Sequence, residues 1–298
     1  MRIVLRVLRA LAFLLLAAVI CLAVFVYIGS ERRLRAKYDM TVEPLAARTD
    51  SASLARGRHL FQSITCALCH AADGGGAIMQ QDRMIGTMAG PNLTSGRGGI
   101  GAQRSDEEFI RAIRHGVRHD GTSLIVMPSE VFTHLADSDL ASMLGYIRQL
   151  PPVDRDVPAT GFGLLGRALL AAGKMNILVA PKTPRDDAPA SPPPLATVEY
   201  GRYLADVSGC HGCHGFGLSG GRVAGPPGFP PASNLTPTGI GEWTEADFTR
   251  ALREGTRPDG SVLDEFMPWR VFRNMSDDDV HSLWLYLQTV PPKEFGNK

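Results

Sequence analysis

Residues 66–70 read Cys-Ala-Leu-Cys-His, and residues 210–214 read Cys-His-Gly-Cys-His. Each stretch places two thiols three residues apart, with an imidazole directly after the second thiol. In a helix this spacing brings both sulfurs within about one turn of 3.6 residues. The fifth cysteine, Cys21, lies in an apolar run, so no cysteine remains to form a disulfide framework.

The Cys-x-x-Cys-His spacing is typical of covalent haem attachment. His70 and His214 are then expected to bind the two irons. Four thiols are expected to form the thioether bonds, namely Cys66, Cys69, Cys210 and Cys213. A four-thiolate zinc site and a thioredoxin-like redox pair are competing interpretations. Because the cysteine pairs lie far apart, each with its own histidine and no βαβ pattern around it, the sequence favours two covalently bound haem c groups.

The two motifs belong to an internal repeat. Gly57, Leu60 and the first motif recur 144 residues later, and Asn92-Leu93-Thr94 recurs as Asn234-Leu235-Thr236. The last part of each copy aligns without a gap at an offset of 140 residues. We therefore expect two homologous domains, at residues 51–152 and 197–293.

The repeat also indicates the second axial ligand of each iron. Met127 and Met267, each followed by proline, are the ligand-capable pair that both copies share after the motif. Candidate histidines do not recur, since His59 aligns with Tyr203 and His134 with Asn274. A thioether favours ferrous iron and raises the reduction potential. With both axial positions filled, the pattern predicts electron transfer rather than chemistry at the iron.

Two neighbouring features concern the surroundings of the first haem. The carbonyl of Pro91 is expected to accept a hydrogen bond from Nδ1 of His70, which would raise the basicity of the ligand. In the second copy Ser233 occupies the corresponding position. Three methionines in the first loop, Met79, Met84 and Met88, are expected to form an adaptable apolar lining rather than a copper site.

Helical patterns recur around both motifs, and no alternating stretch long enough for a sheet is present. Ser105 and Glu108 form a predicted capping box, with Thr244 and Asp247 in the same positions of the second copy. Further helices are expected before each motif and near the end of each copy, where Ser276 is an expected N-cap. The predicted fold is all-α, with two tandem class I cytochrome c domains after an N-terminal transmembrane helix.

The N-terminal segment contains nineteen residues without a charge, Ala10 to Ile28, which is long enough to cross a membrane. A cleaved signal peptide is the alternative, but its apolar region is usually only about 7–15 residues long. We expect an uncleaved anchor at 10–28, cytoplasmic residues 1–9 and a linker at 29–50. Because covalent haem is attached outside the cytoplasm, the location expected for the haem domains is the periplasmic side of a bacterial inner membrane.

Residues 153–196 are rich in proline and are expected to link the two domains. Within them, Gly161 to Asn176 predicts a short apolar helix. We expect this helix to pack between the two domains. The alternative is a position on the membrane surface.

The second copy carries a more specific pattern. Residues 239–248 read Gly-Ile-Gly-Glu-Trp-Thr-Glu-Ala-Asp-Phe, and Ala-Leu-Arg-Glu-Gly, Pro-Asp-Gly and Met-Pro follow at 251–255, 258–260 and 267–268. This pattern resembles the cytochrome c subunits of bacterial membrane-bound alcohol, gluconate and sorbitol dehydrogenases. The resemblance implies electron flow from a quinoprotein or flavoprotein dehydrogenase toward quinone or a terminal oxidase. Those subunits usually carry three haem domains, and the first copy departs from them with Gln103 where Trp243 stands.

These observations lead to three candidate functions. A tethered periplasmic electron carrier, which is not itself an enzyme, is the favoured one. A dihaem enzyme, peroxidase-like or oxidising a sulfur compound, would need an open position at one iron. A haem sensor or assembly factor would need an attached signalling domain. The net charge of +1 argues neither for nor against a nucleic-acid partner, but the sequence has no basic run outside the N-terminal flanks and no nucleic-acid motif, so no such partner is expected.

Overall fold

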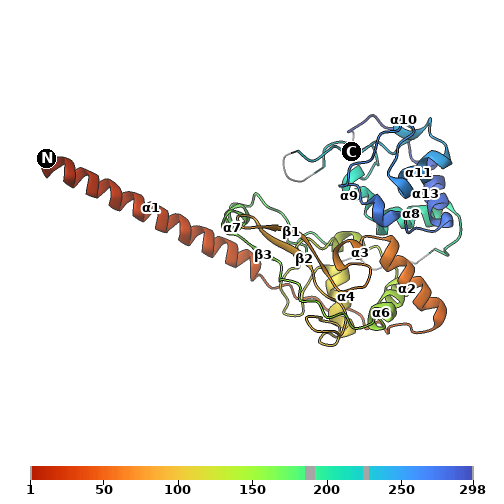
Figure 1. The fold of residues 1–298 in the computed structure, drawn as a ribbon, viewed down its shortest axis with the longest axis horizontal. Coiled ribbons are helices and arrows are strands. Elements are labelled where there is room, and N and C mark those ends of the chain that lie inside the picture. The colour runs from red at the N-terminus through yellow and green to blue at the C-terminus, as the bar shows by residue number, and fades with distance from the viewer. Residues whose placement is uncertain (1, 185–191, 224–227, 297–298) are drawn as a thin grey trace.

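The computed structural model of the chain describes residues 2–184, 192–223 and 228–296. Helix α1 (Arg2–Leu34) projects alone from one side, and the other elements gather beyond its carboxyl end (Figure 1). The chain then runs along the first copy of the repeat, where the Arg48 amide donates to the Ala141 carbonyl at 3.0 Å. The segment expected to be a linker at 29–50 is therefore partly helical and partly packed against the fold.

Five helices occur in the same order in each copy of the repeat. We call residues 51–152 module 1 and residues 197–293 module 2. Module 1 contains α2 (Ser51–Ser63), α3 (Cys66–His70), α4 (Asp106–His115), α5 (Ser129–Phe132) and α6 (Asp137–Arg148). Module 2 contains α8 (Val198–Val207), α9 (Cys210–His214), α11 (Glu245–Glu254), α12 (Trp269–Phe272) and α13 (Asp277–Thr289), with the short α10 (Pro237–Ile240) before α11.

A glycine allows the first and last helices of each module to cross closely. A Cβ on Gly57 of α2 would lie 2.0 Å from the Ser142 carbonyl oxygen of α6. A Cβ on Gly201 of α8 would lie 1.9 Å from the Ser282 carbonyl oxygen of α13. Both distances are far inside van der Waals contact, so any side chain would force the helices apart. The recurrence of this glycine in the repeat therefore follows from helix packing.

The predicted helix starts are confirmed. Ser105 and Glu108 form a capping box at α4, and Thr244 and Asp247 form one at α11. Ser276 is the N-cap of α13, and its partner is Asp279. Such caps satisfy backbone amides that have no partner within the helix.

The prediction of a fold without strands was wrong in one region. The loop after α3 contains β1 (Ala77–Asp82) and β2 (Gly86–Gly90), which pair antiparallel, and β3 (Gly161–Phe162) pairs with β2. The Asp82 carboxylate accepts the amides of Met84 and Ile85 and so closes the turn between β1 and β2. Most β1 residues are exposed, so this strand lacks the alternation of apolar and polar residues that marks a half-buried strand.

The apolar segment between the modules is shorter and lies elsewhere than expected. Only α7 (Leu164–Ala171) of the predicted stretch 161–176 is helical. It packs along α1 rather than between the modules (Figure 1). Residues 185–191 of the predicted linker lie outside the described residues.

The buried core is continuous from one module into the other. Leu60, Phe61 and Leu144 of module 1 belong to the same apolar cluster as Leu204 and Leu283 of module 2. The half-buried Met127 and Met267 pack against this cluster, as do Cys66 and Cys210. The motifs and the predicted second ligands therefore border one common core.

Candidate functional site

Each Cys-x-x-Cys-His motif forms a single short helix, as its spacing predicts. Helix α3 carries Cys66, Cys69 and His70, and helix α9 carries the corresponding residues of module 2. All five cysteines of the chain are free thiols. No cluster of three or more His, Cys, Asp or Glu side chains suited to a metal ion occurs among the described residues, so the four cysteines do not converge on a zinc site.

Both motif histidines are held by a backbone carbonyl in the same way. Nδ1 of His70 lies 3.0 Å from the carbonyl oxygen of Pro91, as predicted. Nδ1 of His214 lies 2.7 Å from the carbonyl oxygen of Ser233, which occupies the corresponding position. Because a carbonyl only accepts, Nδ1 carries the proton in both rings, so Nε2 of the neutral ring keeps its lone pair. That tautomer is the one in which Nε2 binds a metal.

The backbone leaves both motifs through the same rare conformation. Ala71, directly after His70, has φ 60° and ψ 163°. Gly215, directly after His214, has φ 80° and ψ 162°. Glycine adopts this region readily, whereas a residue with a Cβ is strained there. The strain at Ala71 shows that the fold of module 1 imposes the turn on a residue that does not favour it.

An asparagine ties the loop after each motif to a carbonyl at the end of its own module or one residue beyond it. Nδ2 of Asn92 donates to the Val153 carbonyl at 2.7 Å, and Nδ2 of Asn234 donates to the Lys293 carbonyl at 2.8 Å. The Asn92 side-chain oxygen also accepts the amide of Thr94 at 2.9 Å. These bonds explain the repeated Asn-Leu-Thr and keep the carbonyl of residue 91 or 233, which accepts the histidine hydrogen bond, in place.

The thiols lie in surroundings that keep them protonated. Burial raises the pKa of Cys66 and of Cys210 to about 12, and the pKa of Cys69 to about 11. A reactive dithiol of the thioredoxin type needs the opposite shift, because the thiolate is the nucleophile. Burial also lowers the pKa of His70, which favours a neutral ring. The motifs therefore do not have the electrostatics of a dithiol redox centre.

The structure places Met127 just before α5 and Met267 just before α12, each followed by its proline. One further sulfur lies beside the first motif, since Sδ of Met79 is 3.0 Å from Sγ of Cys69. Sequence analysis grouped Met79 with the apolar lining and did not predict this contact, which depends on the β1–β2 hairpin. The ligand role of Met127 and Met267 remains a prediction.

Comparison with known protein families identifies the family to which module 1 is similar. Residues 52–147 match the family model described as cytochrome c oxidase, cbb3-type, subunit III. The matched residues form a cytochrome c domain. Domains of this family bind haem c covalently, and the free thiols of α3 and the unprotonated Nε2 of His70 fit that group.

Over most of its length the chain is similar to cytochrome c subunits of dehydrogenases. It is 29% identical to the fructose dehydrogenase cytochrome subunit of Gluconobacter japonicus, covering 84% of this chain and 55% of that protein. It is 28% identical to the cytochrome c subunit of the quinone alcohol dehydrogenase of Gluconacetobacter polyoxogenes, covering 82% and 57%. It is also 28% identical to the gluconate 2-dehydrogenase cytochrome c subunit of Pantoea cypripedii, covering 83% and 62%. The chain thus spans little more than half the length of these relatives.

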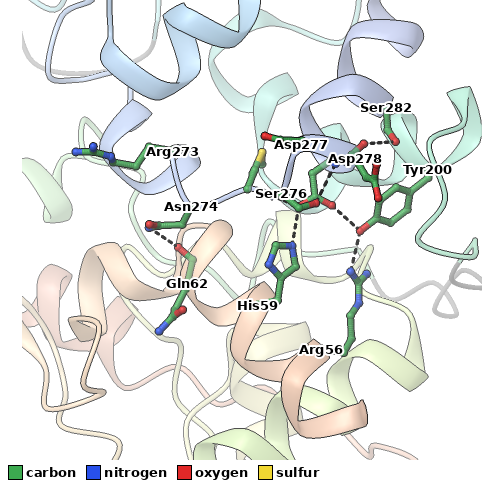
Figure 2. A network of polar contacts seen from close by, with 12 residues as sticks. Arg56, His59, Gln62, Tyr200, Arg273, Asn274, Ser276, Asp277, Asp278 and Ser282 are labelled. Carbon is green, nitrogen blue, oxygen red and sulfur yellow. Dashed lines mark hydrogen bonds and ion pairs between the residues drawn. The ribbon is translucent and has the colours of Figure 1, made fainter.

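The cytochrome c domain meets module 2 through a buried polar network that sequence analysis missed (Figure 2). Arg56 of α2 forms an ion pair with Asp139 at 2.7 Å and donates to the Tyr200 hydroxyl at 2.7 Å. That hydroxyl donates in turn to Asp279 at 2.9 Å. His59, one turn after Arg56, donates to Asp279 at 2.6 Å. Helix α2 of the cytochrome c domain is therefore joined to α8 and α13 of module 2.

The network has approximate two-fold symmetry. His59 corresponds to Tyr203 in the repeat, and Asp139 corresponds to Asp279. His59 contacts Asp279 of the other module, and the Tyr203 hydroxyl donates to Asp139 of the other module at 2.7 Å. Each aspartate thus accepts hydrogen bonds from its own module and one from the opposite module. The contact is isologous, as in a symmetric dimer.

Proposed function

We propose that the chain is a membrane-anchored periplasmic dihaem cytochrome c that carries electrons between a dehydrogenase, or another respiratory donor, and a downstream respiratory acceptor. The observation that supports it best is the duplicated histidine environment. His70 and His214 each have Nδ1 held by a carbonyl at the same place in the repeat, 3.0 and 2.7 Å away. The proposal gives each module one haem, and so a cytochrome c domain at both 51–152 and 197–293.

The proposed attachment and ligation use eight side chains. Cys66, Cys69, Cys210 and Cys213 would hold the two groups covalently, and His70, His214, Met127 and Met267 would bind the irons. Haem in such a site supplies one-electron oxidation and reduction. The carbonyls of Pro91 and Ser233 orient the two imidazoles, and the thioether sulfurs favour the reduced state. If these four side chains bind the two irons, no position would remain on either iron for a substrate.

The packing of the modules supports direct exchange between the two proposed haems. Gly209 immediately precedes α9, and a Cβ at this glycine would lie 3.4 Å from the Val131 side chain of α5. Val131 stands four residues after Met127. The residue just before the second haem motif therefore lies beside the segment that follows the proposed ligand of the first.

The anchor and the partners belong to the same proposal. Arg2–Leu34 is one helix, long and apolar enough to cross a membrane, and very little of its most apolar window is buried. We propose that it remains attached and holds both modules in the periplasm at the inner membrane. The relatives named above are subunits of fructose, alcohol and gluconate dehydrogenases. A quinoprotein or flavoprotein dehydrogenase is therefore the proposed donor, and a quinone or terminal oxidase the proposed acceptor.

The ligand assignment is tested by replacing each methionine in the full chain produced with a cytochrome c maturation system. Met127→Ala and Met267→Ala should each leave two covalent haems per chain, open one iron to added imidazole and lower one reduction potential. Met175→Ala, in the segment after α7, is the matched control and should change none of these. If a ligand variant kept both potentials and bound no imidazole, the assignment would be wrong. An open iron in the unaltered protein would favour the dihaem enzyme instead.

A further inference from the structure

Helix α7 packs on α1 at the level where the apolar segment ends. A Cβ on Gly29 would lie 3.1 Å from Cβ of Ala171. The Arg167 guanidinium donates to the Ser30 hydroxyl at 3.1 Å and to the Glu31 carboxylate at 2.7 Å. Val26, inside the apolar segment, is one of the few buried residues of α1. Val26 stands two residues, about half a helical turn, before the last apolar residue, Ile28, so the contact lies where the apolar segment ends.

The turn of the β1–β2 hairpin is attached to the start of this helix. The Gly163 amide donates to the Ile85 carbonyl at 3.0 Å, and the Gly166 amide donates to the Met84 carbonyl at 3.1 Å. A Cβ on Gly166 would lie 2.1 Å from the Ile85 oxygen, so the two backbones touch. The turn and the helix form one unit beside the end of α1 (Figure 1). We call residues 83–85 and 164–171 the collar.

The collar exposes large apolar side chains. Leu164 is 69% exposed, Met84 52% and Leu165 43%. Exposed basic residues stand close by in the chain, with Arg83 directly before Met84, Lys174 after α7, and Arg32 and Arg33 at the end of α1. Apolar side chains bordered by Lys and Arg are typical of elements that lie in the boundary between lipid headgroups and acyl chains.

We propose that the collar inserts Met84, Leu164 and Leu165 into the headgroup region of the membrane that α1 crosses. This inference rests on the proposed membrane anchor. If α1 spans the hydrocarbon layer up to Ile28, residues 29–31 lie just outside that layer. Helix α7 contacts these residues and is therefore at the height of the lipid headgroups. The basic residues then face lipid phosphates, so the collar favours an anionic lipid surface. Two attachments, the span and the collar, set the height and tilt of module 1 relative to the membrane.

The test is lipid photolabelling of the full haem-loaded chain. The protein is reconstituted in vesicles of phosphatidylethanolamine and phosphatidylglycerol that contain a phospholipid with a diazirine at the start of its acyl chain. After illumination, lipid adducts are mapped on peptides by mass spectrometry. We expect adducts on α1, on residues 83–85 and on α7. The double variant Leu164→Glu, Leu165→Glu should lose the collar adducts and keep those on α1.

The matched control is Leu195→Glu, which changes an exposed leucine before α8 and should leave all adducts unchanged. Adducts on α1 without adducts on the collar would overturn this inference and leave the anchor intact. Collar adducts that persist in the double variant would also overturn it, because the leucines would not be what reaches the lipid. An unlabelled α1 would overturn both the anchor and the collar.

Discussion

Arg56 donates a hydrogen bond to Tyr200, the residue that occupies its own position 144 residues later in the repeat, with Nη1 and the phenol oxygen 2.7 Å apart. Two corresponding side chains that touch each other lie on the two-fold axis of an isologous contact. The two modules therefore pack about an approximate two-fold axis that passes between Arg56 and Tyr200. In Figure 2 His59 and Ser276 lie to one side of this pair.

Removal of Arg56 is expected to destabilise the protein strongly. Arg56→Ala leaves the Asp139 carboxylate, 6% exposed, without its ion-pair partner. Removal of the cation from a buried ion pair costs about 3–5 kcal/mol. The free energy of unfolding, measured with denaturant, should fall by about 3 kcal/mol or more. Arg97→Ala removes an exposed pair with Asp156 and should cost less than about 1 kcal/mol. Equal losses in the two variants would contradict the account of the network.

Asp279 makes the stability of the protein depend on acid pH. Burial alone would raise the pKa of its carboxyl, but hydrogen bonds from His59, Ser276 and Tyr200 outweigh burial and hold the pKa below its usual value. A lowered pKa in the folded state gives stability that is present above the unfolded pKa, about 3.9, and is lost as pH falls through the folded pKa.

The measurement is the free energy of unfolding between pH 7 and pH 3 for the unaltered protein and for Asp279→Asn. The variant should be less stable at pH 7 and should lose less stability below about pH 4. Curves of the same shape for both proteins would show that Asp279 does not contribute through its charge.

The strained residue after the first motif provides a matched pair of variants. Ala71→Gly should stabilise the haem-loaded protein by about 1 kcal/mol, because the released strain of about 1–3 kcal/mol exceeds the added entropy of the unfolded chain. Gly215→Ala introduces the same strain in module 2 and should destabilise by a similar amount. Thermal unfolding followed by haem absorbance measures both shifts. Shifts of the same sign would contradict the equivalence of the two turns.

Local signals in the sequence predicted much of this structure. The capping residues predicted the starts of α4, α11 and α13, and the hydrogen bond of His70 to the Pro91 carbonyl was also predicted. Such features depend on residues close together in the chain. The β1–β2 hairpin was missed because β1 is mostly exposed and carries no alternating pattern.

The contact between the modules could not be predicted by matching the copies. That comparison favours positions where both copies carry the same residue. It excluded His59 as an iron ligand because the aligned residue in the second copy is Tyr203. In the structure His59 and Tyr203 differ because each reaches across to the aspartate of the other module. The position of α7 was missed for a similar reason, since its partner α1 lies more than one hundred residues earlier.

The central claim, one redox-active haem in each module, is tested most directly by counting electrons in a reductive titration of the full chain. The unaltered protein should take up two electrons per chain. Each of two double variants should keep one covalent haem and take up one electron. The first is Cys66→Ser with Cys69→Ser, and the second is Cys210→Ser with Cys213→Ser. Uptake of a single electron by the unaltered protein, or of two by either double variant, would contradict the account.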